Sequence, residues 1–325
     1  MLSGDIMADI VTHATFALDV ALVLKDESLF NSNRMIYFLG SQGPDVFYFY
    51  NLLGFYQNTT YKKFGNYMHN NKASEFLSES VKYLKDNYND SLYSYLCGFI
   101  CHHALDRNVH PYVYHVTGTG DIKYRGNHLH LERAIDSWFI INRWNKKRPH
   151  RFKIYKEIIN FKIDKALYQK FYDTIVKKVY NKENGGKVFI NSISNFRRYI
   201  RLIYDRYGLK KKIARTIDRC FNKKGKIVLE KVFYYQNFDK NIDYFNFKHK
   251  KWSHPVIKNK ISEASFIDLY NNALNQAVRE INQVNLFLEG KLSEADLRLV
   301  IKDLSYATGL LCSENNEMKY FNVIF

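Results

Sequence analysis

Histidine and carboxylate residues gather in one short window of the chain, between Cys101 and Glu132. Six of the eleven histidines fall there: His102, His103, His110, His115, His128 and His130. His102 is followed four residues later by Asp106, and His128 is followed four residues later by Glu132. Residues four apart on a helix lie on the same face, so each pair can grip one divalent cation. Mixed nitrogen and oxygen ligation suits zinc, and the window therefore predicts a metal centre.

Apolar residues recur at helical intervals through most of the chain, and these intervals predict the elements that position the candidate ligands. We expect helices over residues 11–24, 71–88, 90–106, 128–141, 164–180, 188–204, 210–221, 263–287 and 294–307. Asp90 is the expected N-cap of the helix that carries His102. Glycines interrupt residues 30–65 and 117–127, which we expect to form loops. Strand-like alternation is rare and no repeat is evident, so the expected architecture is all-α, a multi-helical bundle.

The chain is strongly basic, with 49 Lys and Arg residues against 32 Asp and Glu residues and a formal charge of +17. This excess favours anionic partners such as a phospholipid surface, nucleic acid or a phosphate ester. A Lys-rich solvated surface explains the charge equally well. The four cysteines have no CxxC spacing, which indicates reduced core residues instead of a disulfide framework.

No targeting or membrane-spanning segment is visible in the sequence. The start of the chain lacks a basic region followed by a long apolar run, and Met7 is an alternative start. The most apolar stretch, residues 92–101, is shorter than the ~20 residues that a bilayer needs. We therefore expect a cytoplasmic protein, with a secreted form already stripped of its signal peptide as the alternative.

The candidate ligands divide the chain into two parts. We expect a catalytic region over residues 7–150 and a helical C-terminal region of unknown role, packed on the first, over residues 151–325. Residues 222–260 of the second part are rich in Lys and aromatic side chains. This segment suits phosphate or lipid contacts, but a loop whose aromatics cover the core is the favoured interpretation.

Three residues upstream of the window can join its ligands: His13, Asp45 and His69. Six sequence fragments that contain these residues and the window occur in order: Thr-His-x-x-Phe-Ala, Gly-Ser-Gln-Gly-Pro-Asp, Met-His, Gly-Phe-Ile-Cys-His-His-Ala-Leu-Asp, His-Pro and His-x-x-x-Glu. In this order they resemble the zinc-dependent phospholipase C family, which shares its helical fold with the P1-type nucleases. The resemblance covers about residues 7–140.

The resemblance implies a cluster of two or three zinc ions. One zinc would be held by Asp45, His69, His102 and Asp106. A second would be held by His110, His128 and Glu132. His13 would contribute to a third together with Asp106, which would then bridge two metals.

The chain departs from the family pattern at two places. Secreted members use the amino group of an N-terminal Trp on the third zinc, and this chain has no Trp near its start. Those members also place the second-site histidine after a proline, whereas His110 precedes Pro111. His115 is the alternative ligand to His110 at the second site.

These residue types suit the hydrolysis of a phosphodiester. Clustered zinc ions neutralise phosphate charge and lower the pKa of a bound water to about 7. Asp45 is the candidate general base, and Tyr61, Asn66 and Asn70 are candidate phosphate contacts. The leading function is a zinc-dependent phospholipase C-type hydrolase acting on phospholipids. The alternatives are a P1-type single-strand nuclease, another soluble phosphodiesterase, and a basic binding module with structural zinc.

Overall fold

The computed structural model describes residues 9–51, 61, 63–120, 124, 126–221, 229–234, 239, 241–314 and 316–325. Helices dominate this part of the chain, and the strands β1 (Trp252–Ser253) and β2 (Ile261–Ser262) form one short antiparallel pair. The prediction of an all-α protein is confirmed. The α-helices are α1 (Ile10–Leu24), α2 (Arg34–Gly40), α3 (Phe64–Asn70), α4 (Ala73–Asp86), α5 (Asp90–Thr117), α6 (Asn127–Asn142), α7 (Ile154–Glu157), α8 (Lys165–Tyr180), α9 (Gly185–Ile203), α10 (Leu209–Phe221), α11 (Phe266–Leu288) and α12 (Glu294–Val300).

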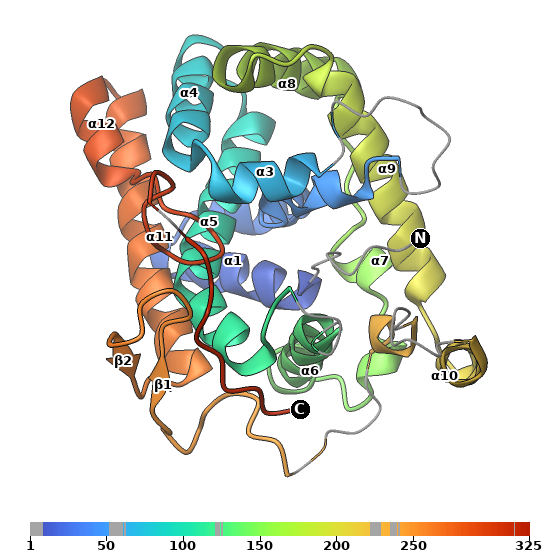
Figure 1. The fold of residues 1–325 in the computed structure, drawn as a ribbon. Helices are drawn as coiled ribbons and strands as arrows, with labels where there is room; N and C mark the ends of the chain where they lie inside the picture. The colour runs from blue at the N-terminus through green and yellow to red at the C-terminus, as the bar shows by residue number, and fades with distance from the viewer. Residues whose placement is uncertain are drawn as a thin grey trace.

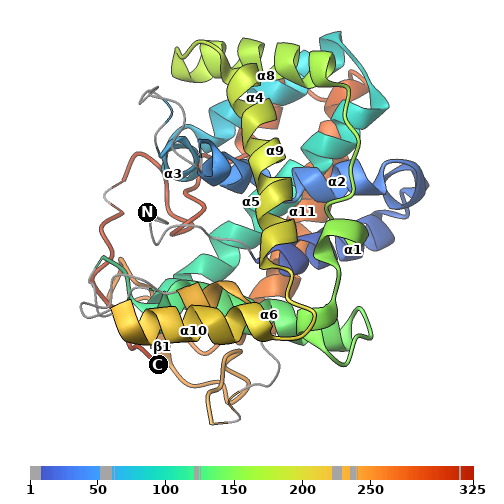
Figure 2. The same cartoon turned by 90° about the vertical axis from the view of Figure 1, so that its right-hand side faces the viewer.

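The long helix α5 runs through the middle of the molecule, as the two views in Figures 1 and 2 show. Helices α1, α2, α4, α6 and α11 all pack against it. Its side chains are buried on every side, which is the pattern of a helix in the centre of a core. The residues that could bind metal on α5 are therefore held in a fixed, dry environment.

Two glycines allow α2 to cross α5 at very short range. A Cβ atom on Gly98 would collide with the carbonyl oxygen of Tyr37, and a Cβ on Gly40 would collide with that of Tyr95. The close crossing brings the chain that follows α2 directly beside α5. That chain forms the 3-10 helix η2 (Gly43–Phe49), which carries Asp45.

Some expected boundaries were wrong. Helix α5 does not end at Asp106 but continues through Pro111 to Thr117, and its N-cap is Asn89, whose side chain accepts hydrogen bonds from the backbone of Ser91 and Leu92. Residues 30–65, expected to be a loop, contain α2 and η2, because Gly40 serves close packing and does not break the chain. Helix α12 ends at Val300, and Leu304 then pairs with Leu311 in a bridge, where a helix to residue 307 was expected.

The C-terminal half packs on the first half through α9, which contacts η2, and α11, which lies along α5. A single cluster of buried apolar side chains extends through both halves. In the segment 222–260, Tyr234, Phe245 and Trp252 are buried and Phe247 is exposed, so the described aromatics mostly cover the core. Residues 222–228, 235–238 and 240 lie outside the described residues, and so does Met7. The division of the chain at residue 150 stays a prediction.

No helix within the described residues is long and apolar enough to cross a lipid bilayer.

Candidate metal centre

One face of α5 carries three potential ligands at successive turns. His102, Asp106 and His110 are spaced four residues apart, and each is at most 3% exposed. Asp106 Oδ2 lies 3.0 Å from His102 Nε2 and 3.7 Å from His110 Nδ1. Because the helix continues past Pro111, His110 stays on the face of Asp106, one turn further on.

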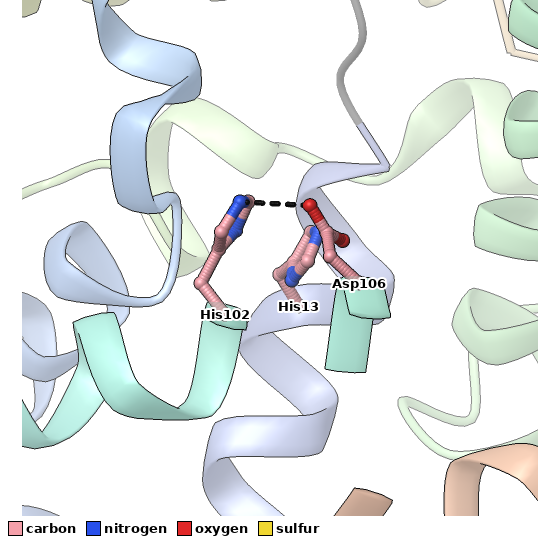
Figure 3. Close-up of side chains that lie close together, drawn as sticks. All are labelled: His13, His102 and Asp106. Atoms are coloured by element: carbon pink, nitrogen blue, oxygen red, sulfur yellow. Dashed lines mark ion pairs between the residues drawn. The ribbon is translucent and has the colours of Figure 1, made fainter. Parts of the chain in front are cut away.

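Helix α1 supplies His13, which faces the second oxygen of Asp106. His13 Nε2 lies 3.2 Å from Asp106 Oδ1, and its ring stacks on that of His102 with 4.2 Å between the centroids. Figure 3 shows the three side chains converging from α1 and α5. Each oxygen of Asp106 thus faces a different histidine, which is the arrangement that a bridging carboxylate needs.

Asp45 and His69 complete the side of the centre next to His102. Asp45 Oδ1 lies 3.0 Å from His69 Nε2, which in turn is 3.8 Å from Asp106 Oδ2. Gly43 makes this approach possible, because it adopts a φ of +49° and a Cβ there would collide with the His102 ring. Potential ligand atoms of Asp45, His69 and His102 lie within 4.8 Å of one another.

A second group lies between α5 and α6. His110, His128 and Glu132 each offer a ligand atom within 4.8 Å of the others. His128 Nε2 is 2.7 Å from Glu132 Oε1. The His128 side chain is 15% exposed, whereas Glu132 and His110 are almost fully buried. The second group is therefore closer to solvent than the first.

Asp9 belongs to the centre although the sequence analysis did not identify it. It is 5% exposed, and its Oδ1 lies 2.9 Å from His13 Nε2. Ligand atoms of Asp9, His13 and Asp45 lie within 4.8 Å of one another. Asp9 and His13 are four residues apart, the same spacing that singled out His102 with Asp106, so the signal was present in the sequence.

Backbone carbonyls fix the orientation of three of the histidines. The Nδ1 atoms of His69, His102 and His110 lie 2.7, 3.0 and 3.0 Å from the carbonyl oxygens of Gly65, Ser41 and Tyr306. A carbonyl only accepts, so each Nδ1 carries the proton and each Nε2 is left with a free lone pair. Metal-binding histidines are commonly held in this way.

The polar atoms around Asp106 form no hydrogen bond of good geometry among the described residues, although ion pairs of 2.9 to 3.2 Å join His13, His69 and His102 to the carboxylates. They are both ring nitrogens of His13, Nε2 of His69, Nε2 of His102, Oδ1 of Asp45 and both oxygens of Asp106. Buried polar atoms left in this state cost free energy. Divalent cations would satisfy them, and the donor set of imidazoles and carboxylates fits zinc.

The electrostatics of the centre point the same way. Burial alone would lower the pKa of His13, but the carboxylates of Asp9 and Asp106 outweigh it and raise that pKa well above its usual value. Burial alone would also lower the pKa of His128, but the Glu132 carboxylate outweighs it and raises that pKa. Burial would raise the pKa of Asp106, but His102, His110 and His13 hold it well below its usual value. The carboxylates thus create a negative site that favours cations.

Other candidates from the sequence lie elsewhere. His115 Nδ1 lies 3.3 Å from the Tyr320 carbonyl oxygen, and His130 packs on Phe325. The Tyr61 hydroxyl donates to the Glu183 carbonyl, and Asn70 accepts from Ser305. None of these four joins a described group of potential ligands.

Fold and site together define a helical protein with a buried cluster of histidines and carboxylates that could hold metal ions. The sequence model of one family, zinc dependent phospholipase C, matches residues 12–186, which is more than half of the chain. The protein belongs to this family, as the sequence fragments predicted. The match extends beyond the 7–140 region of the resemblance to include α8. No curated protein and no solved structure matches the chain.

Proposed function

We propose that this protein hydrolyses phosphodiesters, with phospholipids as the substrate class, at a cluster of two or three zinc ions. The observation that carries the proposal is the set of buried polar atoms around Asp106 that form no hydrogen bond of good geometry among the described residues. Family membership supports zinc as the metal. Bound zinc would neutralise the phosphate charge and make a water molecule acidic enough to react near neutral pH.

We assign the ligands in three groups. Asp45, His69, His102 and Asp106 form the first, and His110, His128 and Glu132 form the second. His13, Asp106 and Asp9 form the third, in which the Asp9 carboxylate supplies what an N-terminal amino group supplies in secreted members. The positions of these side chains support the assignment, because each group brings its donor atoms to within hydrogen-bonding or near-contact distance.

Within this centre Asp45 takes the role of general base. Its Oδ1 is buried and lies 3.0 Å from His69 Nε2, and its carboxylate also comes within 4.8 Å of ligand atoms of Asp9 and His13. An acceptor in that position can take the proton from the attacking water. The histidines hold their lone pairs toward the same space, and their backbone hydrogen bonds keep them there.

The test combines metal analysis with assays on two substrates. Purified protein should contain tightly bound zinc and should release the phosphorylated head group from phosphatidylcholine, and a chelator should abolish that release. Protein without metal would contradict the proposal, and cleavage of single-stranded DNA without lipid hydrolysis would favour the nuclease alternative.

The variant Asp45→Asn separates catalysis from structure. It should lower turnover at least about a hundredfold with zinc still bound, because the amide oxygen can remain a ligand. The exposed Asp86→Asn is the matched control and should leave turnover unchanged. Loss of folding in Asp45→Asn, with zinc lost too, would indicate a structural metal instead.

A further inference from the structure

Helix α10 (Leu209–Phe221) turns its apolar face toward solvent. Leu209, Ile213 and Ile217 are spaced four residues apart, so they form one stripe, and they are 58%, 60% and 37% exposed. Among the described residues of the helix Ala214 is buried, about 100° around the axis from Ile213 in the middle of the stripe. An amphipathic helix of a globular protein normally faces the other way.

The polar face of α10 is the one that is anchored to the protein. Asp218 accepts hydrogen bonds from the backbone of Leu229 and Glu230, and Arg215 pairs with the Glu230 side chain. These contacts join α10 to the 3-10 helix η5 (Leu229–Val232), on which it mainly packs. The outward position of the apolar stripe is therefore fixed by specific contacts.

Positive charge surrounds the stripe. Lys212 and Arg219 are exposed on its flank, and Lys210 lies on the other side. His150 and Asp205 line the same small cavity, and the Asp205 carboxylate accepts a hydrogen bond from the backbone N–H of Lys211. His150 and its basic neighbours in the chain, Arg148 and Arg151, therefore lie close to the start of α10.

We propose that α10 is an interfacial helix, which inserts Leu209, Ile213 and Ile217 into the surface of an anionic phospholipid bilayer while its basic flank binds the head groups. Such a surface binds an exposed apolar stripe between basic side chains, because the apolar residues enter the interface and the basic residues are attracted to the anionic head groups. A second copy of this chain is the less suitable occupant, because it would bring its own Lys212 and Arg219 against the same basic flank.

Helix α10 is connected through η5 to α6, the helix that carries the proposed ligands His128 and Glu132. η5 contacts α6, where Arg133 Nε donates to the Val232 carbonyl and Lys231 Nζ to Asn127 Oδ1. Arg133 directly follows the proposed ligand Glu132. Figure 1 shows α10 at the outer edge of the molecule, and η5 contacts both α10 and α6. The inference extends the proposed function, but it depends on binding to a bilayer and not on hydrolysis.

The test is co-sedimentation of the zinc-loaded protein with vesicles at low temperature. Vesicles of equal amounts of phosphatidylcholine and phosphatidylserine should bind the protein, and vesicles of phosphatidylcholine alone should bind it much less. The triple variant L209Q/I213Q/I217Q should bind at least about tenfold more weakly. The variant K212E/R219E should lose about fivefold for each positive charge removed, and more for the reversal.

Leu299→Gln is the matched control, because Leu299 is 73% exposed on α12, at the opposite edge of the molecule in Figure 1. It should bind like the unmodified protein. Every variant should hydrolyse a short-chain, monomeric phosphatidylcholine at the unmodified rate, which separates this inference from the proposed function. Undiminished vesicle binding by both α10 variants would overturn the inference. The inference would also be overturned if the unmodified protein formed a dimer and did not bind anionic vesicles, and if the triple variant were a monomer.

Discussion

The imidazole of His103 donates a hydrogen bond from Nε2 to the carbonyl oxygen of Leu304, 201 residues further along the chain, with 3.0 Å between the atoms. The direction follows from Arg107, whose Nη1 lies 3.0 Å from His103 Nδ1. A guanidinium can only donate, so Nδ1 accepts and Nε2 carries the proton. His103 therefore joins α5 to the segment after α12 in its neutral form.

This neutral histidine makes stability depend on pH. Burial, followed by the charge of Arg107, lowers the pKa of His103 well below its usual value of 6.5. Between the two pKa values the unfolded chain is protonated at His103 and the folded chain is not. The contribution of His103 to the free energy of unfolding is therefore fully present above pH 6.5 and decreases as the pH falls toward the folded pKa. The expected slope is about 1.4 kcal/mol per pH unit.

Urea unfolding of the zinc-loaded protein across that range would measure the slope. His103→Gln should be less stable at pH 7 but should lose this component of the slope, because the metal ligands titrate alike in both proteins. Equal slopes in the two proteins would show that His103 is not the responsible group.

Tyr306 supports the metal centre from the C-terminal half. Its ring centroid lies 4.5 Å from that of His103 and 5.1 Å from that of His69, and its carbonyl accepts from His110 Nδ1. Tyr306→Ala should cost about 3–5 kcal/mol in the free energy of unfolding because it leaves a cavity, and zinc affinity should fall. Tyr306→Phe keeps the ring and should retain full zinc content by elemental analysis. Equal zinc affinity in the two variants would show that the Tyr306 ring does not support the metal centre.

Asp9 should determine how many metal ions the protein holds. Asp9→Ala removes the carboxylate that lies 2.9 Å from His13 Nε2, so the zinc content should drop by one ion per chain while the other two sites keep theirs. Mass spectrometry of the intact holoprotein would count the ions, with Asp86→Ala as the control. An unchanged count would exclude Asp9 as a ligand.

Substitution of His110 and of His115 should show which of the two histidines is a ligand of the second site. His110→Gln should lose zinc from that site and lower activity at least about a hundredfold, since even the outer partners of metal ligands are worth 10–100-fold. His115→Gln should keep both, because His115 contacts the Tyr320 carbonyl away from the groups around Asp106. The opposite result would make His115 the ligand.

Much of the candidate centre was predictable because its potential ligands follow the helical period. The spacing of His102 with Asp106 and of His128 with Glu132 placed each pair on one face, and the structure has them within 3.0 Å and 2.7 Å. The same spacing relates Asp9 to His13 and identifies Asp9 as a further potential ligand.

The remaining features depend on contacts that have no local signature. The carbonyl of Tyr306 can bind His110 whatever its side chain is, so residue types alone do not identify it. Pro111 normally ends a helix, yet packing on every side of α5 carries the helix past it. For α10 the periodicity predicted a helix, but only tertiary contacts decide that Asp218 faces inward and Ile213 outward.

The hydrogen bond between His110 and Tyr306 spans 196 residues, and this separation has a consequence for biosynthesis. A growing chain can expose all seven of the ligands implied for the first two sites well before residue 306 leaves the ribosome. Until then His110 lacks this acceptor, and His103 lacks its partner at Leu304. A chain cut before Tyr306 would therefore keep every proposed ligand of these two sites but lack the carbonyl that orients His110.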